Sequence, residues 1–254
     1  MNEHEAQQDP CYKRNYLTQV IARVDFLAPV DSMEKKLPDK IIKSLKQSFP
    51  LVEPKKITAN QLMISAKDHK LVKQHSMLWN LHGENRDKVL TITSDYAYIE
   101  YKTFKNYQTL RQEFEAMCEV LLESFEEIGS KRLGLRYINN IRPQEEDPLA
   151  WGDYINNDML HLTEFRRYQN YLSRLMNVIE YKFDEMNLRY QFGMHNPDYP
   201  SRIKQKVFVL DLDGYIDIYH TLRGITPQLD ILHSKIQELF EHSITQKFRE
   251  HLDA

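Results

Sequence analysis

One pattern occurs twice in this sequence, and the two copies lie 118 residues apart. With no gap, this offset aligns residues 88–103 (KVLTITSDYAYIEYKT) with residues 206–221 (KVFVLDLDGYIDIYHT) and continues into the stretches that follow. Alternating apolar residues are typical of strands, and apolar residues three and four apart are typical of helices. Each copy is therefore expected to form a β-hairpin followed by a helix, and the match indicates an internal duplication. The identical pairs are Lys88/Lys206, Val89/Val207, Asp95/Asp213, Tyr101/Tyr219, Thr103/Thr221, Leu121/Leu239 and Glu123/Glu241.

The two helices of this repeat are predicted at about 107–128 and from Pro227 to the C-terminus. In the first helix, Gly129 is expected to end the helix and Cys118 to lie on the buried face. Its apolar positions are Tyr107, Leu110, Phe114, Met117, Cys118, Leu121, Leu122 and Phe125. Those of the second are Leu229, Leu232, Ile236, Leu239, Phe240, Ile244, Phe248 and Leu252.

The remaining pattern predicts strands joined by short connections, with one short helix at 41–49. Alternation and β-branched or aromatic residues mark the strands. Besides the hairpin that runs from Lys206 to Leu212 and from Gly214 to Thr221, they are 16–27, 61–66, 76–82, 88–94, 96–103, 132–141, 171–183 and 186–194. The predicted fold class is α+β, with mostly antiparallel sheets, covering helices and two quasi-duplicated halves.

Composition shifts along the chain suggest its organisation. Residues 1–14 are polar and predict a disordered leader, and the Pro- and acid-rich stretch RPQEEDP marks a boundary between halves. The expected divisions are an N-terminal α+β half at 15–142, a connector at 143–168 and a C-terminal α+β half at 169–254.

Charge and apolar content exclude several classes of protein. The formal net charge of −3 gives no global attraction to nucleic acid or to an acidic membrane surface. No signal-like start and no long apolar run occurs, so the sequence predicts a cytoplasmic protein without a membrane partner. The two cysteines, Cys11 and Cys118, favour a reducing compartment and offer neither a disulfide framework nor a zinc site.

The stretch VFVLDLDGYI at 207–216 resembles the nucleophile loop of haloacid-dehalogenase-type phosphatases. That resemblance implies that Asp211 attacks phosphorus and Asp213 acts as acid and base, with a magnesium ion between them. Tyr215 departs from the Thr or Val of that family, few residues follow to supply the rest of the site, and a hairpin turn explains Asp213-Gly214. No catalytic residue is therefore assigned, although an unrecognised hydrolase stays the third hypothesis.

Metal and cofactor sites have little support. Asp211, Asp213 and Asp217 alternate on one strand face and either bind a divalent cation or form a solvated edge. His233, His242 and His251 are nine residues apart on a predicted helix, which places them on alternating sides. The chain has only seven glycines and neither GxGxxG nor GxxxxGK[ST], so no cofactor and no metal is expected.

A basic and aromatic strand at 132–142 is the candidate binding patch. Aromatic and arginine side chains on a sheet can stack on bases and contact phosphates. The candidate residues are Arg136, Tyr137, Asn139, Asn140 and Arg142. The alternative is that Asn139 and Asn140 cap or turn the chain before Pro143.

Three segments resemble a sporadically distributed bacterial family of proteins of about this length whose function is unassigned. They are YLTQVIARVDF near the start, LGLRYINNI at 133–141 and FEHSITQKFREHL at 240–252. The resemblance spans most of the chain, and LRYIN is its most specific part. It implies an accessory locus, including a defence-related one, and supplies no catalytic residues.

The leading hypothesis is a non-enzymatic binding or scaffold protein, with a protein partner or self-association through sheet edges or the terminal helix. The alternative is a protein that binds nucleic acid or a nucleotide ligand.

Overall fold

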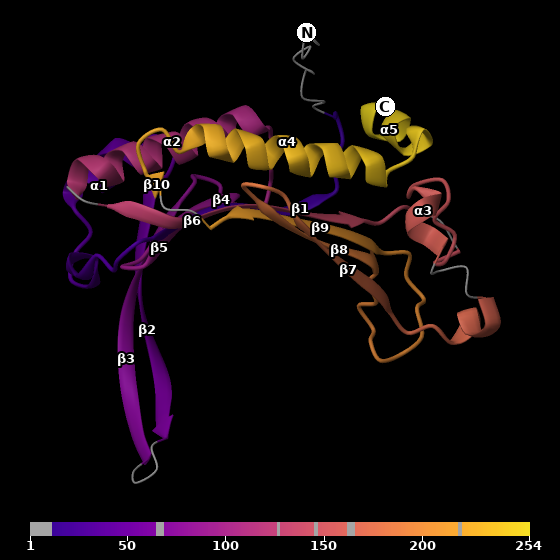
Figure 1. Ribbon diagram of the computed structural model, residues 1–254, viewed down its shortest axis with the longest axis horizontal. Coiled ribbons are helices and arrows are strands. Elements are labelled where there is room, and N and C mark those ends of the chain that lie inside the picture. Colours follow the sequence, from indigo (N-terminus) through magenta and orange to yellow (C-terminus); the bar gives the residue numbers. More distant parts are fainter. Residues whose placement is uncertain (1–11, 65–68, 126–127, 145–146, 162–165, 218–219) are drawn as a thin grey trace.

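The computed structural model describes residues 12–64, 69–125, 128–144, 147–161, 166–217 and 220–254. They form one antiparallel sheet with helices on one of its faces, which confirms the α+β class (Figure 1). The sheet order is β2-β3-β4-β5-β1-β6-β9-β8-β7, and a short tenth strand, β10, also pairs with β6. No helix among these residues is both long and apolar enough to cross a membrane.

The strands are β1 (Leu17–Phe26), β2 (Leu51–Ile64), β3 (His69–His82), β4 (Lys88–Ile92), β5 (Tyr96–Tyr101), β6 (Gly129–Ile141), β7 (Leu175–Lys182), β8 (Asn187–Met194), β9 (Phe208–Ile216) and β10 (His220–Thr221). The helices are α1 (Asp39–Leu45), α2 (Tyr107–Ser124), α3 (Asn157–Leu160), α4 (Thr226–Ser243) and α5 (Gln246–Asp253), with 3₁₀ turns at Asp31–Glu34 and Arg166–Tyr171.

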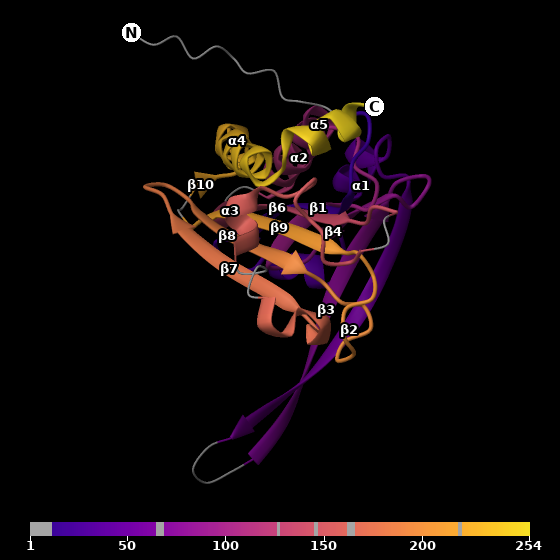
Figure 2. The same ribbon diagram turned by 90° about the vertical axis from the view of Figure 1, so that its right-hand side faces the viewer.

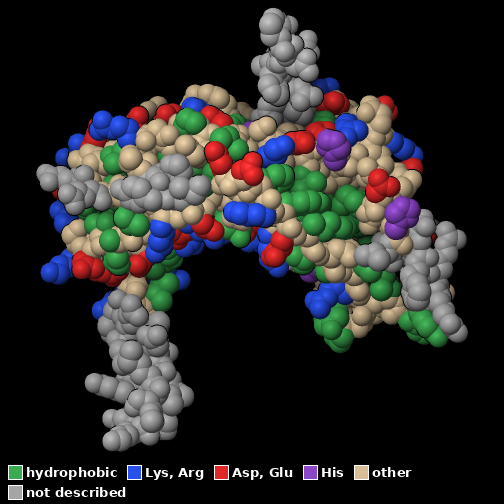
Figure 3. Space-filling model, in the orientation of Figure 1, with side chains coloured by type: hydrophobic (Ala, Val, Ile, Leu, Met, Phe, Trp, Pro, Cys, Tyr) green, Lys and Arg blue, Asp and Glu red, His purple; other side chains and the backbone are tan. Residues whose placement is uncertain are grey.

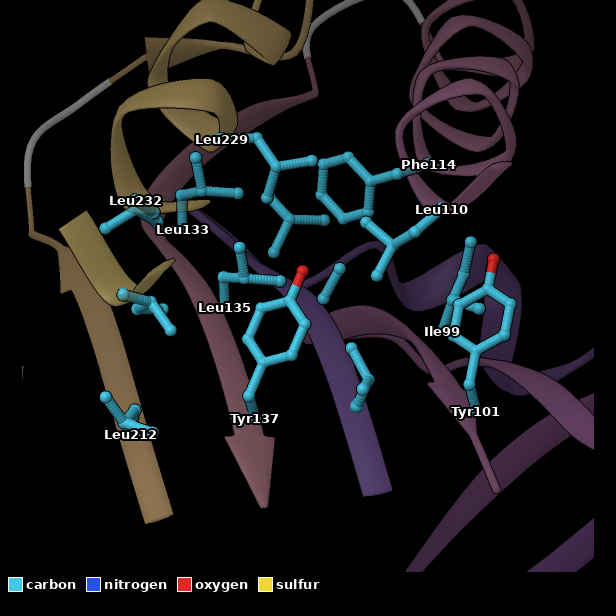
Figure 4. Close-up of a cluster of buried hydrophobic side chains, with 14 of the residues drawn as sticks. Ile99, Tyr101, Leu110, Phe114, Leu133, Leu135, Tyr137, Leu212, Leu229 and Leu232 are labelled. Carbon is cyan, nitrogen blue, oxygen red and sulfur yellow. The ribbon is translucent and has the colours of Figure 1, made fainter. Parts of the chain in front are cut away.

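The core lies between the sheet and the long helices α2 and α4. In β1 and β6 every second side chain lies on this side of the sheet and is buried. This alternation is the reason that both strands could be predicted from the sequence. Figure 4 shows Phe114 of α2 and Leu229 of α4 above Leu135 of β6, with Tyr137 pointing from the same strand toward the gap between the helices. All three apolar residues are fully buried. Cys118 is buried on α2, as predicted.

Strands β2 and β3 form a long hairpin that extends from the sheet away from the helices (Figures 1 and 2). Strands β2, β3, β4 and β5 pair in chain order as an antiparallel meander. Residues 51–60 were not predicted as strand, because Pro54, Lys55 and Lys56 interrupt the apolar pattern there. Pro54 is compatible with β2 because β2 is an edge strand, where an amide can be missing from the ladder.

The predicted hairpin at 206–221 is wrong. Residues 208–216 form the single strand β9, and β9 and β10 pair one after the other along β6. Gly214 therefore lies within a strand, where its hydrogen atoms face Ile236 and Leu232 of α4 and a Cβ would lie 3.2 and 3.3 Å from their methyl carbons. A glycine needed for close helix packing was mistaken for a turn glycine.

In the sheet order, β5, β4, β3 and β2 lie beyond β1, whereas only β9, β8 and β7 lie beyond β6. Helix α2 follows β5, and helix α4 follows β9 and β10. This order does not confirm the 118-residue duplication, because that offset aligns the β4–β5 hairpin with residues 206–221, where β9 is a single strand. Pairing of β6 with both β1 and β9 joins the two proposed halves in one continuous sheet.

Both predicted helix ends need correction. Helix α2 ends at Ser124, and Gly129 begins β6. The terminal helix is divided in two, because Ile244 has extended backbone and Thr245 then caps α5 by accepting a hydrogen bond from Phe248 N at 3.1 Å. Ile244 also forms an isolated bridge with Ile155 of the connector, which brings the short helix α3 beside this break.

Most of the predicted disordered leader, residues 1–11, lies outside the described residues. Tyr12 and Arg14 belong to the described part and contact the C-terminal helices: Tyr12 donates to the Glu241 carboxylate at 2.8 Å and Arg14 N donates to Leu252 O at 2.9 Å. The first described residues are thus held against α4 and α5.

Candidate functional site

The predicted binding residues of β6 do not share one surface. Alternation places Arg136 and Asn140 on the sheet face without helices, and Tyr137 and Asn139 beneath the helices, where they are 7% and 5% exposed. Arg142 follows the strand, is exposed and donates to Asn140 Oδ1 at 3.3 Å. Neither Asn139 nor Asn140 caps a helix or forms a turn, since both lie in β6.

The side of the sheet without helices is called the concave face, because both ends of the sheet curve toward that side (Figure 1). Figure 3 shows the hollow beneath the arch, with basic and acidic side chains next to one another along its edge. The cross-strand register places a row of alternating charge on this face. From β5 to β7 the row contains Glu100, Ile21, Arg136, Asp213, Arg189 and Glu180.

Arg136 is tied to Asp211 on the neighbouring strand. Its Nε and Nη2 atoms donate to the two carboxylate oxygens at 2.7 and 2.6 Å, which is the two-point geometry that guanidinium favours. These hydrogen bonds to Asp211 raise the pKa of Arg136. Asp211 is 8% exposed, so removal of Arg136 would leave a buried carboxylate without its ion-pair partner. Both oxygens that a phosphatase nucleophile would use are therefore occupied.

Asp213 lies opposite both Arg136 and Arg189 in the register. Burial raises the pKa of this carboxyl, while the positive charges of Arg136 and Arg132 act in the opposite direction. Asp217 lies 3.3 Å from Arg132, so the three aspartates face arginines. No group of three or more metal-ligating side chains occurs among the described residues.

Two arginines of the concave face cover tyrosine rings. The guanidinium of Arg23 lies 4.0 Å from the ring centre of Tyr96, and that of Arg132 lies 3.7 Å from the ring centre of Tyr215. Tyr98 stacks beside Tyr96 with 6.0 Å between ring centres. Cation–π contacts hold these side chains in fixed positions while leaving them half exposed. The sequence prediction missed Arg23 and the tyrosines, because only the sheet register brings them beside Arg132 and Arg136.

Tyr137 and Asn139 line a second feature, a cavity of about 100 Å³ on the helix side of the sheet. His233 of α4 lies there between two tyrosines. Its ring is stacked on Tyr107 at 3.6 Å and 8°, and its Nδ1 atom is 3.1 Å from the Tyr137 hydroxyl. His233 was not singled out as a binding residue, because sequence spacing cannot show that Tyr107 and Tyr137 meet it.

The comparisons with known proteins leave the function open. No protein-family model matches this chain, and no curated protein matches it. Among solved structures, the chain is similar to Methanococcus jannaschii TBP, with 10% identity over 87% of this chain and 97% of that chain. The TM-score is 0.25, so this similarity carries no argument about function.

Proposed function

We propose that this chain is a non-enzymatic binding protein whose concave face binds a protein partner. One observation carries the proposal: half-exposed tyrosines and arginines cluster on a sheet face that none of the described helices covers. Tyr and Arg are enriched at the energetic centres of protein interfaces, where they supply large contact area and directional hydrogen bonds. Contacts among Arg23, Tyr96, Arg132 and Tyr215 preorganise these side chains and reduce the entropy lost on binding.

The charge of the concave face favours a protein over nucleic acid. A phosphate backbone requires an excess of positive charge, because its affinity comes mainly from cations that replace counterions. Here carboxylates at least balance the cations. The cations are Arg23, Arg132, Arg136, Lys182 and Arg189; the carboxylates are Asp25, Glu100, Glu180, Asp211, Asp213 and Asp217. A partner with complementary charges of both signs fits this surface.

Affinity purification with matched variants tests the proposal. The tagged protein is recovered from its own cells, with and without nuclease, and proteins in the eluate are quantified by mass spectrometry. We expect a stoichiometric protein that resists nuclease and is lost with Arg132→Ala and with Arg23→Ala. Lys40→Ala is the control, because it removes an exposed ion pair with Glu123 from the helix layer. Recovery of nucleic acid that depends on Arg132 would instead support the nucleic-acid alternative.

The edge strand β7 favours self-association as a second candidate. At the other edge, β2 carries Pro54, Lys55 and Lys56, which hinder pairing with a further strand. Within the described residues β7 pairs only with β8, and its Val178 and Ile179 are 50% and 39% exposed. Light scattering across a concentration series is expected to show a dimer that Val178→Lys converts to a monomer. A wild-type monomer at every concentration would eliminate this candidate.

A further inference from the structure

We propose that the cavity beneath α4 binds a small organic monocarboxylate, with its apolar body inside and its carboxylate toward the opening. This site is on the opposite side of the sheet from the concave face and is independent of the function proposed above. The N-terminal segment, β6, α4 and α5 form its walls. Its lining residues used in the argument are Arg14, Lys105, Asn139, His233, Phe240 and Phe248.

The side chain of Asn139 is the first evidence that the cavity binds a ligand. Its side chain is 5% exposed and lines the cavity, and no described residue hydrogen-bonds to its amide group. The amide faces the cavity and not a polar group of the protein, so its hydrogen bonds are left to solvent or to a ligand that enters the cavity. A bound group that accepts or donates hydrogen bonds would use this amide.

The charges of the lining favour an anion. Arg14 and Lys105 contribute positive charge, and Asn106 caps the N-terminus of the 18-residue helix α2 beside them. Among the described residues that line the cavity there is no aspartate or glutamate, although the chain has 37 acidic residues. Helix N-terminal amides and cations together stabilise a carboxylate. The unpartnered Asn139 amide supplies a hydrogen bond at greater depth.

The apolar walls and the volume of the cavity limit the polarity and the size of the ligand's apolar part. Ile141, Leu212, Ile236, Phe240, Phe248 and Leu252 make most of the interior apolar. An apolar cavity of roughly 150 Å³ holds benzene, so the 100 Å³ here suits a short aliphatic chain and is too small for a nucleotide. This size argues against the nucleotide-ligand alternative at this site.

Hydrogen bonds outside the cavity keep one of its walls in place. The Tyr107 hydroxyl donates to Asp230 Oδ1 at 2.6 Å, and Arg111 donates to the same carboxylate at 2.8 and 3.1 Å. Because Tyr107 is stacked on His233, this arrangement fixes the histidine ring as well. A site whose side chains are already fixed binds a small ligand with less loss of entropy.

The test uses sodium hexanoate as the probe and 1-hexanol as its uncharged counterpart, with the full chain followed by NMR and calorimetry. We expect saturable hexanoate binding with shifts at β6 and α4, and at least tenfold weaker binding of hexanol. Asn139→Leu should weaken hexanoate binding at least tenfold without lowering the midpoint of thermal unfolding. Arg14→Gln changes an exposed residue and should weaken binding severalfold without affecting folding.

Lys40→Gln on α1 is the matched control and should bind hexanoate as the wild type does. Equal binding of hexanol and hexanoate would overturn the carboxylate assignment and leave an apolar cavity. Absence of saturable binding, or unchanged affinity in Asn139→Leu, would overturn the site itself. Arg132→Ala, on the other side of the sheet, should not change hexanoate binding, which separates this test from that of the proposed function.

Discussion

Arg136 on β6 holds both carboxylate oxygens of Asp211 on β9, through hydrogen bonds of 2.7 and 2.6 Å. This ion pair joins β6, the last strand of the proposed N-terminal half, to β9 of the C-terminal half. It also gives Arg136 a structural role, so loss of binding in an Arg136 variant would not by itself identify a binding residue.

Arg136→Ala is expected to lower the free energy of unfolding by about 2–4 kcal/mol, because the buried Asp211 loses its partner. Arg132→Ala should lower it by less than about 1 kcal/mol, because its partner Asp217 has a half-exposed side chain. Urea denaturation of both variants measures the difference. Similar losses in the two variants would contradict the distinction between a structural and a surface arginine.

Asp213→Asn should stabilise the protein at neutral pH. Burial raises the pKa of this carboxyl in the folded state, so ionisation is less favourable there than in the unfolded chain. The resulting loss of stability begins as the pH rises through the unfolded-state pKa and is complete above the folded-state pKa. The advantage of the variant should therefore disappear below the ordinary aspartate pKa of 3.8. Unfolding measured across acidic and neutral pH tests this, and a pH-independent difference would contradict it.

Gly214→Val should lower the free energy of unfolding by about 1–3 kcal/mol through overpacking. Even a single Cβ would lie 3.2 Å from Ile236 and 3.3 Å from Leu232, so the larger side chain must displace α4. Gly152→Val is a control, since the nearest atom to a Cβ there is 3.8 Å away. Thermal unfolding of the two variants compares them, and equal midpoints would argue against close packing of α4 on β9.

The Cys118 thiol should react with iodoacetamide only after unfolding. It is 2% exposed in the core face of α2, and burial raises its pKa, so little reactive thiolate forms. A Cys11→Ser variant leaves Cys118 as the single thiol, and mass spectrometry follows its modification with and without denaturant. Rapid labelling of the native protein would show that α2 does not cover this position.

Elements with a strong local pattern could be predicted from the sequence. β1, β6 and α2 each bury one face. Apolar residues, such as Val20 in β1, Leu135 in β6 and Phe114 in α2, therefore recur with the period of the strand or helix that contains them. Asp213-Gly214 was misread because a turn and a close helix–strand contact both favour glycine. The division of α4 from α5 was also missed, since it depends on Ile244 pairing with the distant Ile155.

The candidate sites could be predicted only in part. The sequence pattern identified β6 as a candidate site. Because side chains alternate along a strand, Arg136 and Tyr137 lie on opposite faces of the sheet. Arg23 joins Arg132 on the concave face only through pairing of β1 with β6. His233 meets Tyr107 only because α2 and α4 pack side by side. Such contacts depend on sheet order, which local periodicity does not determine.

Site-specific photo-crosslinking tests the central claim most directly. A benzophenone side chain replaces Tyr98 or Tyr215 on the concave face, or Ile231, which is 42% exposed on α4. After irradiation in the producing cells, we expect one protein to be crosslinked from both tyrosine positions and not from Ile231. Crosslinks from Ile231 alone, or to nucleic acid from the tyrosine positions, would contradict a protein-binding concave face.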